Sequence, residues 1–67
     1  MDTSKLKGKM VERGYTQDTL ARAIKIDRST LNRKLKQGDS FTIGEANRLV
    51  AVLGLNAEEA SEIFLLS

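Results

Sequence analysis

The chain has 67 residues and contains neither cysteine nor histidine. Its length is that of a single domain, and its composition excludes disulfides, zinc sites of the usual kind and most nucleophile–base pairs. We therefore expect no catalytic residue, no metal, no cofactor and no enzyme activity. The net charge of +2 is uneven, because residues 1–38 carry +6 and residues 39–67 carry −4. This asymmetry indicates one surface that faces a polyanion and another that faces away from it.

Helix start and stop signals predict five α-helices, at residues 3–13, 17–24, 28–37, 43–53 and 57–66. Gly14, Gly38 and Gly54 follow three of them, and glycine favours the left-handed turn past a helix end. Thr42 and Asn56 are each followed three residues later by glutamate, as in a capping box. The period-2 alternation of strands is missing. The predicted fold class is therefore all-α, with one domain spanning residues 1–67.

Each predicted helix has an apolar stripe, as expected for elements that share one small core. The stripes consist of Leu6, Met10, Leu20, Ala21, Ile24, Leu31, Leu35, Ala46, Leu49, Val50, Leu53 and Ile63, the last together with Phe64 or Ala60. Gly8 lies inside the first predicted helix, where it costs about 1 kcal/mol relative to alanine. A close approach of another helix at Gly8 would explain this choice of residue.

The sequence also predicts where the protein resides. No apolar run approaches the roughly 20 residues that span a bilayer, and the N-terminal segment lacks the apolar region of a signal peptide. We expect a cytoplasmic protein that does not bind membranes.

The segment from Thr16 to Gly38 is the most informative part of the chain. Two short predicted helices are joined there by only Lys25, Ile26 and Asp27. So short a connection forces a steep crossing angle and predicts a helix-turn-helix. The small Ala21 would let the two helices cross closely, and the apolar Ile26 would fill the gap between them.

The predicted helix at 28–37 separates polar from apolar residues by face. Ser29, Asn32, Arg33 and Lys36 fall in one sector at about 100° per residue, with Leu31 and Leu35 on another side. Arginine can bind guanine, asparagine adenine, and serine either base. A solvated helix face is the alternative, but residues 28–38 contain lysine and arginine and no acidic residue. This pattern predicts contact with nucleic acid.

Three parts of the sequence together form a pattern, namely Gln17-x-x-Leu20-Ala21, the run from Ile26 to Leu31, and the later Gly38. This pattern resembles the lambda-repressor-like helix-turn-helix family of phage repressors, Cro proteins and bacterial relatives. The resemblance covers most of residues 5–55 and is closest to small phage Cro-like regulators. It implies a compact five-helix domain whose second and third helices form the helix-turn-helix. It also implies a transcriptional regulator, a repressor of Cro or CI type, that binds a double-stranded DNA operator in a bacterial host.

The same resemblance implies roles for individual residues. The base-reading positions are Arg28, Ser29, Asn32 and Arg33. The positions that contact the DNA backbone are Thr16, Gln17, Thr30, Lys36, Ser40 and Thr42. Gln17 would also brace the reading residues, and the segment from Ser40 to Thr42 would offer backbone N–H groups to a phosphate. Phe41 is expected to pack in the core.

Two positions depart from the family pattern. Lys25 stands where the turn usually has glycine, so either it adopts a left-handed conformation at a cost of about 1 kcal/mol or the turn differs. Met10 and Leu35 stand where many members bury an arginine–glutamate pair. We expect an apolar contact between the first and third helices instead, since such replacements are often neutral or stabilising.

Family members generally bind as dimers on palindromic sites, with half-sites about 34 Å apart. The apolar run 63–66 cannot all face one core from a helix. The expected pairing surface consists of Leu55, Phe64, Leu65 and Leu66, unless this tail folds back on its own chain. Three other functions stay open, namely an antitoxin, a protein-interaction module that uses the acidic helix at 57–66, and a single-stranded RNA binder. No small-molecule ligand is evident.

Overall fold

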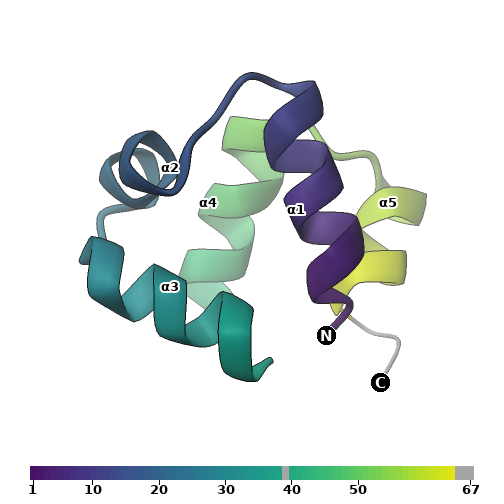
Figure 1. Ribbon diagram of the computed structural model, residues 1–67. Helices are drawn as coiled ribbons and strands as arrows, with labels where there is room; N and C mark the ends of the chain where they lie inside the picture. Colours follow the sequence, from purple (N-terminus) through teal and green to yellow (C-terminus); the bar gives the residue numbers. More distant parts are fainter. Residues whose placement is uncertain (39, 65–67) are drawn as a thin grey trace.

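The computed structural model describes residues 1–38 and 40–64. These residues form five α-helices, α1 (Thr3–Glu12), α2 (Gln17–Ile24), α3 (Arg28–Gln37), α4 (Ile43–Leu53) and α5 (Ala57–Phe64). No strand occurs among them, so the predicted all-α class is confirmed. In Figure 1, α2 and α3 lie on one side and α1 and α5 on the other, with α4 behind and between them. None of the helices in this part of the chain is both long and apolar enough to cross a membrane.

The predicted helix bounds agree with the structure except at two ends. The first helix stops one residue early, because Arg13 leaves helical geometry at φ −92° and ψ 2°. The fifth helix is described as far as Phe64, and the remainder of its predicted range lies outside the described residues. The predicted capping boxes at Thr42–Glu45 and Asn56–Glu59 are both present. Local capping signals therefore set the element order.

Eleven buried apolar side chains from all five helices and the segment after α4 form one core. They are Leu6, Met10, Leu20, Ala21, Ile24, Leu31, Leu35, Leu49, Leu53, Leu55 and Ile63. Each fully buried leucine or isoleucine stabilises the fold by roughly 1.5–3 kcal/mol relative to exposure. Met10 and Leu35 are only 5% and 2% exposed, and α1 packs on α3. The two apolar side chains therefore belong to the core, as expected for an apolar contact between α1 and α3.

Two arginines cap helices other than their own. Arg13 Nε donates to the Leu53 carbonyl oxygen at the end of α4, 3.0 Å away. Arg48 Nε donates to the Ile24 carbonyl oxygen at the end of α2, 2.8 Å away. A cation at a helix C-terminus satisfies a carbonyl and compensates the helix dipole. These two bonds tie α1 to α4 and α4 to α2.

Ion pairs hold α5 against α1. Lys5 pairs with Glu62, and Lys9 pairs with Glu59. The hydrogen bond from Lys9 lowers the pKa of the Glu59 carboxyl, and the same bond raises the pKa of the Lys9 ammonium. Two carboxylates of α5 are therefore directed at α1.

The expected explanation for Gly8, a close approach of another helix, is wrong. A Cβ added at Gly8 would meet no atom within 4 Å, and the residue is exposed. Because the helix surface is open there, no close helix approach requires glycine.

Candidate nucleic-acid interface

The connection between α2 and α3 begins with a left-handed lysine. Lys25 has φ 64° and ψ 44°, which decides between the two alternatives for this turn. The Ile26 N–H donates to the Ala21 carbonyl 3.0 Å away, and the Lys25 N–H donates to the Arg22 carbonyl 3.3 Å away. This pair of bonds is the Schellman arrangement, in which the left-handed position is usually glycine. The turn thus keeps the geometry of a glycine turn with a cation at its apex.

The residues beside this turn bring α2 and α3 close together. Ala21 is 2% exposed, and Ile24 and Leu31 are fully buried. Ile26 is half-buried and packs against the core. A small residue on α2 and an apolar residue in the connection therefore fix the position of α3 relative to α2.

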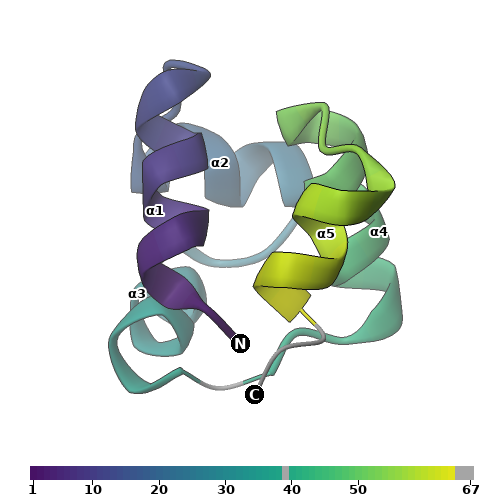
Figure 2. The ribbon, with the colours of Figure 1, turned by 90° about the vertical axis from the view of Figure 1, so that its right-hand side faces the viewer.

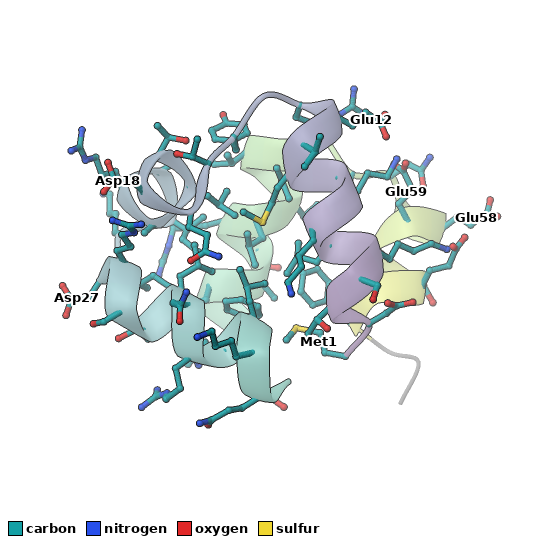
Figure 3. All side chains as sticks on the ribbon, viewed as in Figure 1. Met1, Glu12, Asp18, Asp27, Glu58 and Glu59 are labelled. Atoms are coloured by element: carbon teal, nitrogen blue, oxygen red, sulfur yellow. The ribbon has the colours of Figure 1, made fainter. Side chains whose placement is uncertain are left out.

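The outer face of α3 is polar and free of acidic side chains. The exposed residues of α3 are Arg28, Ser29, Arg33, Lys36 and Gln37. Thr30 and Asn32 are half-buried, whereas Leu31 and Leu35 are buried in the core. Figure 3 shows side chains that end in nitrogen projecting from α3 away from the other helices. The structure thus brings the predicted base-reading residues to one surface.

Asn32 and Gln17 are joined across the two helices. Asn32 Nδ2 donates to Gln17 Oε1, with 2.8 Å between the two atoms. An amide group has two N–H donors and one carbonyl acceptor. Asn32 therefore retains one N–H and its Oδ1, and Gln17 retains its NH₂ group. The bond fixes the rotamer of Asn32 without using up its hydrogen-bonding capacity.

Lys34 points inward, although its charge led us to expect an exposed side chain. It is 9% exposed, and its Nζ donates to the Ser40 carbonyl oxygen 2.7 Å away. The Nζ also lies 3.6 Å from a Glu45 carboxylate oxygen and 5.3 Å from the centre of the Phe41 ring. The signal was its position three residues after Leu31, on the buried stripe. Lys34 therefore orders the connection between α3 and α4.

Two of the predicted backbone-contact residues already use their N–H groups. The Thr42 N–H donates to Glu45 Oε1, 2.9 Å away, in the cap of α4. This bond holds the pKa of the Glu45 carboxyl below its usual range. The Thr16 N–H donates to Thr19 Oγ1, 2.9 Å away, in the cap of α2. Any phosphate contact at these two residues would have to use another group.

The start of α3 is less occupied than the other described helix starts. Asp27 is its N-cap residue, but the side chain makes no capping hydrogen bond. Asp27 is exposed and points outward in Figure 3. The first backbone N–H groups of α3 are thus free of a side-chain acceptor from Asp27.

The residues of the expected pairing surface differ in how exposed they are in the structure. Leu55 is 8% exposed and belongs to the core of its own chain, so little of it is available to a partner. Leu65 and Leu66 lie outside the described residues. Phe64 is half-buried, and its ring meets the Phe41 ring edge to face, with centroids 6.3 Å apart. Phe41 packs against the core as predicted.

An open pocket of about 270 Å³ lies beside these two phenylalanines. Its lining, which we call the apolar patch, consists of Met1, Ser40, Phe41, Thr42, Ile43, Ala46 and Phe64. Figure 2 shows the N-terminus, the start of α4 and the end of α5 in the lower part of the molecule. The patch combines segments that are distant in the sequence.

Comparison with known proteins gives one match. Residues 1–66 match the family described as a protein of unknown function, DUF739. No curated protein and no solved structure matches the chain. Because the match spans nearly the whole sequence, this chain belongs to the DUF739 family.

Proposed function

We propose that this protein is a sequence-specific, double-stranded DNA-binding transcriptional regulator, a repressor of Cro or CI type. In this proposal α2 and α3 form a helix-turn-helix, and α3 enters the major groove of a palindromic operator. The observation that carries the proposal is the Asn32–Gln17 bond across a three-residue connection. It holds the half-buried amide of Asn32 in place on a helix face that has no acidic side chain.

The base-reading side chains fit this role in their chemistry. Asn32 keeps one N–H and one carbonyl oxygen, which together match the N7 and N6 groups of adenine. Arg28 is exposed in the first turn of α3, the end that usually enters the groove. Ser29 and Arg33 belong to the same surface. We expect guanine at the positions that the two arginines contact.

Contacts to the phosphates would supply most of the affinity. Lys36 is exposed on α3, and Lys25 is exposed at the turn. Gln17 retains an NH₂ group that can donate to a phosphate, while Thr30 is half-buried on α3 and Ser40 is exposed after its end. Because each neutralised phosphate releases counterions, the affinity should fall steeply as salt rises.

The acidic helix offers less to a protein partner than its sequence suggested. Glu59 and Glu62 are paired with lysines of α1, which leaves Glu58 as the exposed carboxylate of α5. These pairs favour DNA binding over a protein-interaction function.

The proposal is tested by selecting binding sites from random DNA and titrating them at about 50 mM and about 200 mM salt. Arg28→Ala should cost about 1–3 kcal/mol and relax the preference at one base pair. Lys7→Ala removes the same charge from α1, outside the α2–α3 unit, and serves as the matched control with a much smaller effect. Wild-type binding no tighter than about 10⁻⁴ to 10⁻⁶ M on every sequence would be non-specific and would overturn the proposal.

A further inference from the structure

The apolar patch has no evident role within the described chain. Its five apolar members surround an open pocket of about 270 Å³, and its two other members, Ser40 and Thr42, carry only hydroxyl groups. None of the seven side chains is charged. An apolar cavity of about 150 Å³ holds a molecule the size of benzene, so this pocket is large enough for an aliphatic side chain.

Ile43 stands at the rim of this pocket and is 83% exposed. It is the first residue of α4, a position where a polar residue would serve equally well. Val11, on α1, is the other large apolar side chain of comparable exposure among the described residues, at 78%, and it does not line the pocket. The patch therefore contains both an exposed apolar side chain that can insert into a partner and an apolar pocket that can receive such a side chain.

We propose that the apolar patch is the contact between two copies of this chain, with Ile43 of each copy entering the pocket of the other. A two-fold axis makes both insertions at once, because the same patch must serve both partners. The seven side chains of the patch are uncharged, so their contact brings no like-charged side chains together. The proposal rests on the proposed function, which requires two copies on one palindrome.

The position and size of the patch decide when this contact forms. It includes Ser40, which follows the C-terminal end of α3, so it borders the proposed DNA face. A stable interface engages roughly 20–30 residues on each side, whereas this patch has seven. A contact limited to this patch is therefore too small to hold two copies in free solution. It forms when DNA holds both copies on adjacent half-sites, and it appears as cooperative binding.

The test compares Ile43→Ser with Val11→Ser, which makes the same kind of change at a site away from the pocket. Binding is measured by fluorescence anisotropy on the selected palindrome and on a single half-site, and the mass of the free protein by sedimentation velocity. Ile43→Ser should keep the half-site affinity and lower the cooperativity on the palindrome by at least roughly tenfold. Val11→Ser and the conservative Ile43→Leu should retain the cooperativity, and the free protein should sediment as a monomer.

Each other outcome overturns the proposal in a distinguishable way. Specific and cooperative binding that Ile43→Ser leaves intact would place the contact elsewhere while keeping the proposed function. A lower unfolding temperature of Ile43→Ser without a loss of cooperativity would mean that the pocket is filled from within one chain. A free dimer would contradict a contact that depends on DNA. If wild type binds neither duplex specifically, the proposed function fails and the DNA-held pair fails with it.

Discussion

At the scale of single residues, Lys34 separates two kinds of positive charge on α3. Its ammonium is enclosed by the Ser40 carbonyl, the Phe41 ring and the Glu45 carboxylate. Lys36, two residues on, is exposed. The net charge of α3 therefore exceeds the positive charge that it presents to a polyanion, because the Lys34 ammonium is paired inside the fold.

Lys34→Met should destabilise the protein by about 1–3 kcal/mol, because methionine fills a similar space but leaves the Ser40 carbonyl without its donor and Glu45 without its ion-pair partner. Urea denaturation measures the change. Lys36→Met removes the same charge from the surface and should stay within about 0.5 kcal/mol of wild type. Equal stability of the two variants would show that the enclosed ammonium makes no net contribution.

The sequence predicted the outward residues of α3 and missed the inward lysine for one physical reason. Helical periodicity assigns a face to each position, and Arg28, Ser29 and Arg33 follow that assignment. Lys34 also obeys periodicity, since it follows Leu31 by three residues. Its charge predicted an exposed side chain. Its burial is possible because Glu45 and Ser40, which lie further along the chain, pair with its ammonium group.

At the scale of elements, the turn between α2 and α3 combines strain with charge. Lys25 holds a left-handed conformation that costs a side chain other than glycine roughly 1–2 kcal/mol. Gly14 and Gly54 occupy the equivalent positions after α1 and α4 at φ 79° and 63°. The cation is therefore present at a position where backbone geometry alone favours glycine.

Lys25→Gly should raise the free energy of unfolding by about 1 kcal/mol and weaken DNA binding, with a salt dependence reduced by about one phosphate contact. Lys25→Ala is the matched control, because it loses the charge but keeps the left-handed strain. Denaturant unfolding and salt titration of DNA binding measure the two effects separately. Unchanged DNA affinity in both variants would remove Lys25 from the proposed contact surface.

Gly8→Ala should stabilise the protein by about 0.5–1 kcal/mol, because the added methyl group meets open space within a helix and alanine is the better helix former. The same substitution at Gly54 should destabilise, since that residue lies in the left-handed region. Thermal and urea unfolding compare the two variants. A loss of stability in Gly8→Ala would show that the α1 surface is not open.

Element ends were predictable because their causes are local. A capping threonine or asparagine acts on residues three positions away, and the structure forms these bonds at Thr16, Thr42 and Asn56. The arginine caps at Leu53 and Ile24 join residues 40 and 24 positions apart. No local pattern in the sequence contains that information.

At the scale of the whole molecule, the α1–α5 ion pairs make stability depend on acidity. The pKa of Glu59 is lowered in the folded state, so its contribution is fully present above the ordinary carboxyl pKa of 4.5 and is lost as pH falls through the folded value. The pKa of Glu45 is lowered in the same direction. Both groups therefore favour the folded state at neutral pH and lose this effect in acid.

The unfolding temperature should fall as pH is lowered from about 6 to about 3. The fall should be smaller in Glu59→Gln, which cannot titrate at this position, and Glu58→Gln, at the exposed neighbour, should behave like wild type. Circular dichroism melts across this range measure the effect. An identical acid dependence in wild type and Glu59→Gln would show that the Lys9–Glu59 pair does not couple α1 to α5.

The apolar patch was beyond sequence analysis because three separate segments build it. The predicted pairing surface included Phe64, which lines the patch, and also Leu55, which is buried in the core. Ile43 gave no signal, since one isoleucine at a helix start is compatible with burial or exposure. Only the packing of α4 against its neighbours decides which occurs.

The bond between Gln17 and Asn32 makes the two positions epistatic. A substitution at Asn32 alone strands the Gln17 carbonyl oxygen, and one at Gln17 alone releases the rotamer that Asn32 presents. If α3 reads DNA as proposed, a change of base preference at position 32 requires a companion change at position 17. Divergence of target sites among related chains would then proceed through paired substitutions, with single mutants as the less fit intermediates.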